Sequence, residues 1–150
     1  MTNPTAAMLV IGDEILSGRT RDANMYYLAG ALTEIGIDLK EVRVVSDDKA
    51  AIIAAVTALS QAHDTVITSG GIGPTHDDIT ADCIAAAFDR PIDIRSDARA
   101  LLAAHYDRQG VELNAARLRM ARIPDGATLI DNPVSVAPGF ILENVHVMAG

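Results

Sequence analysis

Three successive cycles of strand, loop and helix constrain the fold of this chain more than any other feature of its sequence. In each cycle a short apolar run is followed by a loop and then by apolar residues at helical spacing. The predicted strands cover residues 6–11, 39–45 and 66–68, and the apolar helical faces cover 25–35, 52–59 and 79–87. Alternation of this kind forms a parallel sheet with right-handed crossovers and helices on both faces. The sequence therefore predicts an α/β fold of three layers, α/β/α, around a mostly parallel sheet.

The pattern changes after Pro91. Apolar residues at helical spacing predict two helices, near 98–105 and 113–120, and Pro124-Asp125-Gly126 predicts a turn. Short late strands are expected at 128–130, 139–142 and 145–148, the last two joined by the tight Glu143-Asn144 connection.

Length and charge limit the remaining possibilities. With 150 residues and 49% hydrophobic content, we expect one domain, 1–150, that buries about 70% of its unfolded surface. The formal net charge is -8, and no basic cluster is denser than Arg117, Arg119 and Arg122, so nucleic acid is not an expected partner. A single cysteine, Cys83, the lack of a signal-peptide pattern and the lack of a run of about 20 apolar residues predict a cytoplasmic protein without membrane contact.

Ligands of parallel α/β proteins lie beyond the carboxyl ends of the strands, so the loops there are the candidate binding site. Glycines after the third strand let the backbone adopt positive φ and approach a ligand, and a following helix start suits a phosphate. The expected substrate-binding residues are Gly12, Asp13, Glu14, Ser69, Gly70, Gly71, Gly73, Thr75, Pro138 and Gly139. The loop matches neither a Walker loop nor the dinucleotide-binding glycine pattern.

Carboxylates crowd the same edge: Asp13, Glu14, Asp47, Asp48, Asp77 and Asp78. Two unit charges about 4 Å apart repel by roughly 4 kcal/mol at an effective dielectric near 20, so bare carboxylates oppose a phosphate more than one helix terminus favours it. Mg²⁺, held by one or two carboxylates plus substrate phosphates, resolves the conflict. The alternative for Asp47 and for Asp22 is ordinary helix capping, whereas Asp78 has no obvious structural duty.

Other reactive residues give no competing site. The four histidines stand at no metal-ligand spacing, Ser17 and Ser69 have no evident base partner, and Cys83 lies on an apolar helical face as a buried, inert thiol. The segment 131–140, with two prolines and a glycine, is either a rigid connector or a loop held against a flat ligand.

Three segments together resemble the MoaB/Mog molybdopterin-binding family, and within it the N-terminal domain of CinA-like proteins. Residues 69–80 resemble its TGGxGPTxDDxT signature. Residues 12–18 with Asp22 and Asn24 resemble its GDEIL opening, and Asn132 with 137–140 resembles its APGF segment. These segments occur in the expected order over nearly the whole chain.

The resemblance implies a domain that binds molybdopterin and, in some members, adenylylates it with Mg²⁺ and ATP. It implies catalytic roles for Asp47, Asp48 and Asp78, magnesium binding by Asp78 and Asp48, and a wall formed by Pro138-Gly139. Trimers or dimers are expected. Some CinA-like relatives instead hydrolyse ADP-ribose-type pyrophosphates, and a third alternative is a non-catalytic module that carries a cofactor.

Two departures from the family pattern stand out. Ile72 occupies the position where the Mog branch has threonine, which weakens the case for adenylyl transfer. The family pattern also continues beyond the last strand, so we expect the chain to be truncated at its C-terminal end.

Overall fold

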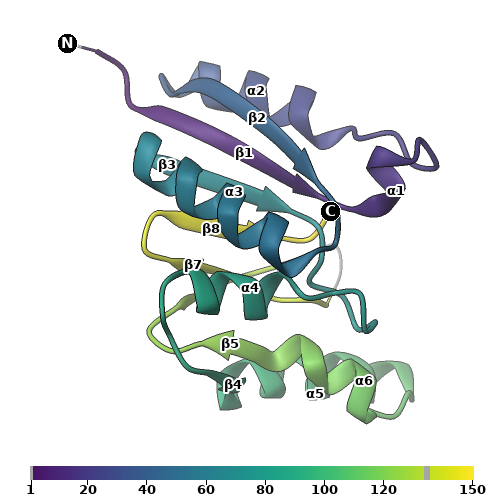
Figure 1. Ribbon diagram of the computed structural model, residues 1–150. Coiled ribbons are helices and arrows are strands. Elements are labelled where there is room, and N and C mark those ends of the chain that lie inside the picture. Colours follow the sequence, from purple (N-terminus) through teal and green to yellow (C-terminus); the bar gives the residue numbers. More distant parts are fainter. Residues whose placement is uncertain (1, 134–135) are drawn as a thin grey trace.

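The computed structural model describes residues 2–133 and 136–150 of the chain (Figure 1). Its first half contains β1 (Thr5–Ile11), α1 (Asp13–Leu16), α2 (Asn24–Glu34), β2 (Asp38–Val45), α3 (Lys49–Ala62), β3 (Thr65–Ser69) and α4 (Thr80–Ala87). Its second half contains β4 (Ile92–Ile94), α5 (Ser96–Gln109), α6 (Ala115–Leu118), the 3₁₀ turn η1 (Arg119–Ala121), β5 (Arg122–Pro124), β6 (Thr128–Ile130), β7 (Gly139–Leu142) and β8 (Val145–Met148). Among these helices none is long and apolar enough to cross a membrane.

The central sheet confirms the predicted parallel architecture. Its strand order is β2-β1-β3-β8-β7-β6. The first four of these strands pair in parallel, whereas β7 and β6 continue the sheet in antiparallel fashion. The carboxyl ends of β1, β2, β3 and β8 therefore meet at one edge.

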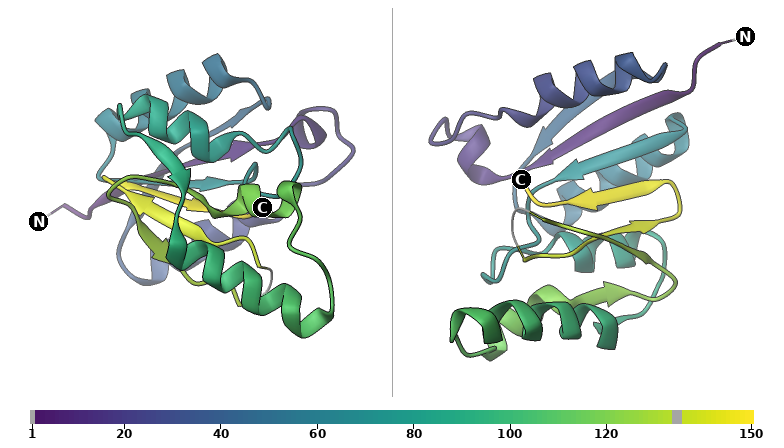
Figure 2. Two further views of the ribbon diagram at one scale, coloured as in Figure 1. Left: turned by 90° about the horizontal axis from the view of Figure 1, so that it is seen from below. Right: turned by 180° about the vertical axis from the view of Figure 1, so that it is seen from behind.

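Helices cover both faces of this sheet, as the sequence predicts. The main core, facing α3 and α4, contains Ala7, Leu9 and Ile11 of β1, whereas Ala6 faces a smaller cluster with Leu32 of α2. This alternation follows from the two-residue period of a strand. In Figures 1 and 2, α3 and α4 lie on one side of the sheet and α2 on the other.

The segment after Pro91 differs in part from its prediction. The helix expected near 98–105 is α5, but the one expected over 113–120 is a single α turn followed by η1. Asn114 caps that turn by accepting a hydrogen bond from the Arg117 N–H, and η1 then leads directly into β5, which pairs antiparallel with β4 in a separate two-stranded sheet. Neither β4 nor β5 was expected from the sequence, and neither was the short α1 within the loop after β1.

Aspartate side chains cap the starts of α2 and α3, but at α3 the cap is Asp48 and not Asp47, whose carboxylate accepts the Asp13 N–H instead. Asp22 accepts hydrogen bonds from the N–H groups of Asn24 and Met25 at the start of α2, and Gly36, with φ +82°, follows its end. Asp48 caps α3 by accepting the Ala51 N–H at 2.9 Å.

The packing of α3 against the sheet predicts how much stability is lost when one of its buried side chains is shortened. Leu59 is 0% exposed within the main core, whereas Leu101 on α5 is 47% exposed. We expect Leu59→Ala to lower the free energy of unfolding by about 2–5 kcal/mol, since it leaves a cavity. The matched control Leu101→Ala should change it by less than about 0.5 kcal/mol. Urea denaturation of both variants measures the difference, and equal effects would contradict this placement of the core.

Candidate functional site

The turn after β3 is the centre of the candidate site. Gly70 and Gly71 adopt φ of +102° and +75°. A Cβ on Gly70 would lie 2.2 Å from the Ile11 carbonyl oxygen, and one on Gly71 would lie 2.0 Å from the Thr80 Oγ1. Both positions therefore require glycine, for conformation and for space.

Thr80 fastens this turn to α4. Its buried hydroxyl donates to the Gly70 carbonyl at 3.0 Å, and its N–H donates to the Gly71 carbonyl at 3.0 Å. The Gly70 N–H donates to the Met148 carbonyl of β8 at 3.1 Å. By contrast, the N–H groups of Gly71, Ile72 and Gly73 make no hydrogen bond to any residue that the structure describes.

Asp78 closes the other end of the loop. Its Oδ2 accepts hydrogen bonds from the N–H and the hydroxyl of Thr75, at 2.9 and 2.8 Å. A Cβ on Gly73 would lie 2.9 Å from the same oxygen. The Asp78 carboxylate thus has a structural duty that the sequence did not reveal, and it lies against the glycine backbone.

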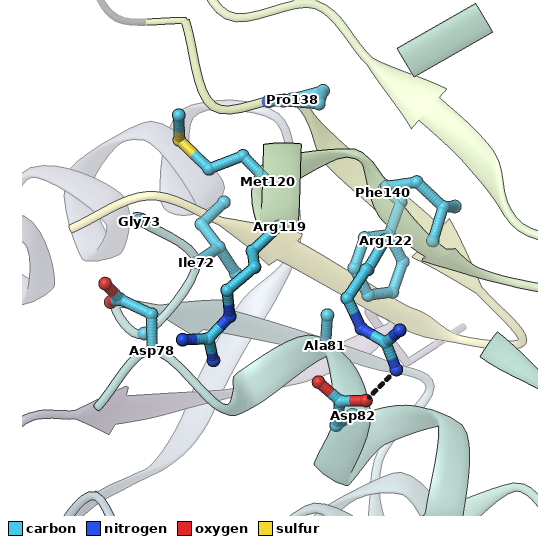
Figure 3. A pocket seen from close by; sticks show the side chains of 12 residues that line it. Ile72, Gly73, Asp78, Ala81, Asp82, Arg119, Met120, Arg122, Pro138 and Phe140 are labelled. Carbon is cyan, nitrogen blue, oxygen red and sulfur yellow. Dashed lines mark hydrogen bonds and ion pairs between the residues drawn. The ribbon is translucent and has the colours of Figure 1, made fainter. Parts of the chain in front are cut away.

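A pocket opens between this loop and the segment that contains η1 (Figure 3). One wall is formed by Gly71, Gly73 and Asp78, and Pro138 borders it from the last loop. The opposite wall contributes Arg119, Met120, Arg122, Ile123 and Phe140. The enclosed volume is about 20 Å³, room for about one water, so a larger ligand would place only a small group inside and extend over the rim.

A second group of predicted residues lies at the ends of β1 and β2. The Asp13 N–H donates to Asp47 Oδ2 at 3.1 Å, and the Asp47 N–H donates to Asp13 Oδ1 at 3.2 Å. Glu14 folds back on Gly12, where a Cβ would lie 2.5 Å from Glu14 Oε1. Burial raises the pKa of Asp47, and the charges of Asp13, Glu14 and Asp77 raise it further, against the lowering effect of the Asp13 hydrogen bond.

The remaining predicted residues border two wider cavities at the same edge. Glu14, Ser69 and Gly70 line one of about 280 Å³, where the Asn24 side-chain amide donates to the Ser69 hydroxyl at 3.2 Å. Gly139 lines another of about 330 Å³ beside Asn132. The structure therefore brings Gly71, Gly73, Asp78 and Pro138 into one pocket, and places the others around it.

The carboxylates fit a magnesium ion only in company with a ligand. In residues 2–133 and 136–150, no three His, Cys, Asp or Glu side chains are grouped to hold a metal ion. Asp48 is engaged as the cap of α3 and Asp78 through Thr75. One or two carboxylates suffice, however, where phosphate oxygens and water complete the coordination shell, and a cation would offset the charges of Asp13, Glu14 and Asp77 around Asp47.

Sequence reasoning missed the wall that faces the glycine loop. Arg119 and Arg122 were visible only as a weak basic cluster, some 40 residues from α4. Cys83, in contrast, is buried as expected, and burial raises the pKa of its thiol to about 11, so it stays protonated at neutral pH.

Comparison with known proteins decides the family. The profile of the family described as "Probable molybdopterin binding domain" matches residues 7–150. The chain belongs to the molybdopterin-binding domain family. A protein of Metallosphaera sedula is 39% identical over 140 residues, which are 93% of this chain and 53% of that protein. A CinA-like protein of Citrifermentans bemidjiense is 40% identical over 137 residues, 91% of this chain and 33% of that protein.

Solved structures agree with this assignment. CinA from Thermoplasma acidophilum superposes with a TM-score of 0.91 at 35% identity, covering 99% of this chain and 89% of that one. MoaB from Pyrococcus furiosus gives a TM-score of 0.60 at 20% identity, covering 100% and 84%, and so supports the fold alone. This molybdopterin-binding domain is thus nearer to CinA than to that MoaB, and it spans about half or less of the curated relatives' length.

The glycine turn predicts a sharp asymmetry between two Gly-to-Ala changes. Gly70→Ala places a Cβ against the Ile11 carbonyl at positive φ, and we expect a loss of at least about 2 kcal/mol of stability. Gly30→Ala in α2 meets nothing within 4 Å and should add about 0.5–1 kcal/mol. Thermal and urea unfolding of both variants test this, and a neutral Gly70→Ala would refute the geometry of the turn.

The environment of Asp47 predicts that replacing its carboxylate with an amide raises thermal stability in a pH-dependent way. Folding raises the pKa of Asp47 above its ordinary value of 3.8. Protonated Asp47 therefore contributes stability that is fully present below pH 3.8 and is lost as the pH rises through the folded pKa. At pH 7 the ionised carboxylate therefore destabilises the fold. Asp47→Asn should raise Tm at pH 7, and the gain should vanish below about pH 4. Asp47→Ala, which also removes the acceptor for the Asp13 N–H, should gain less, and a lower Tm for the Asn variant at pH 7 would contradict the argument.

Proposed function

We propose that this domain binds molybdopterin, with the terminal phosphate of the pterin at the loop from Gly71 to Gly73. One observation carries the proposal: three consecutive N–H groups without partners among the described residues line a pocket together with Asp78. Backbone N–H groups at a glycine loop are suited to phosphate oxygens, since no Cβ limits their approach. Because the pocket has room for about one water, the phosphate would lie at its mouth with one oxygen inside, and the pterin body would extend over the rim.

The carboxylates make binding dependent on a divalent cation. Asp78 and Asp47, with Asp13 and Glu14 near Asp47, would repel a bare phosphate. Bound with the ligand, Mg²⁺ would supply charge neutralisation and polarise the phosphoryl oxygens. The residues of the chain then orient the phosphate: loop N–H groups on one side and the Asp78 carboxylate, fixed by Thr75, on the other.

Two reactions are compatible with such a site. In adenylyl transfer, a phosphate oxygen of molybdopterin attacks the α-phosphorus of ATP, and pyrophosphate leaves. In the second candidate, water attacks a phosphorus of ADP-ribose and releases AMP and ribose 5-phosphate. The second candidate is kept as an alternative because the chain is more similar to CinA than to MoaB and because Ile72 stands where the Mog branch has threonine.

Calorimetry with molybdopterin, under anaerobic conditions with and without Mg²⁺, tests the proposed function. We expect micromolar binding with Mg²⁺ and weaker binding without it. Asp78→Asn keeps an oxygen acceptor for Thr75 but loses the charge, so it should reduce affinity at least about ten-fold in Mg²⁺ and little in its absence. Asp64→Asn is the matched control, because Asp64 accepts the Thr5 N–H at the opposite end of the sheet.

Product analysis then separates the two reactions. The same protein is incubated with molybdopterin and Mg-ATP, or with ADP-ribose and Mg²⁺, and chromatography measures adenylylated pterin in the first case and AMP in the second. Absence of heat with molybdopterin at several hundred micromolar would remove the pterin, while AMP release that Asp78→Asn abolishes would establish the pyrophosphatase instead.

A further inference from the structure

The three arginines that cluster in the sequence near η1 have different partners in the structure. Arg117 donates to the Glu112 carbonyl at 2.8 Å and lies over the Tyr106 ring, 5.2 Å from its centroid. Arg122 donates to the Asp82 carboxylate at 2.7 Å, and this hydrogen bond raises the pKa of its guanidinium. The Arg119 guanidinium makes no hydrogen bond or ion pair with any residue in 2–133 or 136–150.

Arg119 lies on the wall of the pocket that faces the glycine loop. It is half-buried and lines the pocket opposite Gly71, Gly73 and Asp78. Figure 3 shows its guanidinium between Asp78 and Asp82, but both carboxylates are engaged elsewhere, Asp78 with Thr75 and Asp82 with Arg122. The Arg119 guanidinium thus lines the pocket without a counter-charge among the described residues, and an anion bound there would supply one.

The opposite wall indicates which anion. A guanidinium presents a planar fork of N–H donors that matches phosphate or carboxylate oxygens. Across the pocket, Gly71, Ile72 and Gly73 line the other wall, and their N–H groups have no hydrogen-bond partner among the described residues. Donors converging from two sides suit a tetrahedral phosphate with several oxygens better than a planar carboxylate. The chain as a whole carries a formal charge of -8, so it repels anions in general. A positively charged side chain at the pocket is therefore needed to attract a phosphate.

We propose that Arg119 is the residue by which this site recognises a terminal phosphate, its guanidinium binding phosphate oxygens that face away from the glycine loop. This inference rests on the proposed function and adds to it a specificity-determining side chain. It assigns the ligand class as phosphate monoesters or the corresponding phosphoanhydrides, and it predicts that the dephosphorylated form of the same molecule binds poorly.

The test uses matched ligand pairs. The first pair is a fluorescent pterin with a terminal phosphate and the same pterin after phosphatase treatment, and the second is ADP and adenosine, all titrated in Mg²⁺ and followed by fluorescence or calorimetry. Wild type should prefer the phosphorylated member of at least one pair by ten-fold or more. Arg119→Met should weaken binding of that member about ten- to hundred-fold and change binding of its dephosphorylated partner less than about two-fold. Arg119→Lys should recover part of the loss.

Arg117→Met is the matched control, since it removes an arginine near the pocket that already has partners, and its phosphate preference should equal that of wild type. Circular dichroism and Tm establish that each variant is folded. If wild type shows the preference and Arg119→Met retains it, the role of Arg119 is refuted while the proposed function stands. If wild type binds neither phosphorylated ligand, both fail.

Discussion

The rest of the site depends on one steric constraint at the end of β3. Gly70 packs against the Ile11 carbonyl oxygen, and Gly71 packs against the buried Thr80 hydroxyl. Gly70 passes so close to the Ile11 carbonyl that no side chain fits, and Thr80 holds the next residue from the other side. Through these contacts the end of β3 is tied to β1, to β8 and to α4. Because the turn is held by three neighbouring elements, the following N–H groups have a defined place beside the pocket even without a ligand.

The charged side chains at this edge of the sheet form two groups, one acidic and one basic. Carboxylates gather at the ends of β1 and β2, where burial and mutual repulsion raise the pKa of Asp47. Guanidinium groups gather across the pocket, on η1 and β5, where Arg122 is neutralised by Asp82 and Arg119 is not. On the proposed function, a phosphate between this cationic wall and the acidic rim would need both the arginine and a divalent cation.

Local patterns in the sequence were sufficient for most of the fold. The three cycles of strand and helix and the capping by Asp22 depend on neighbouring residues, and both are confirmed. Where the prediction differs, tertiary packing overrides a weak local signal: residues 113–120 form only one α turn before η1 and β5, whose pairing partner β4 lies far back in the chain. Three-residue strands such as β4 and β5 carry too little periodicity to be recognised alone.

The sequence by itself determined the parallel sheet, the edge at which the ligand loops converge and the glycine loop with Asp78, because periodicity and backbone freedom are local properties of consecutive residues. Only the tertiary structure decided which side chains face that loop. The places of Arg119 and Arg122 depend on β5 packing against α4 across 40 residues of chain, and the contact of Asp78 with Thr75 depends on how the loop folds back. Such pairings are set by the summed burial of many distant residues, which no short segment encodes.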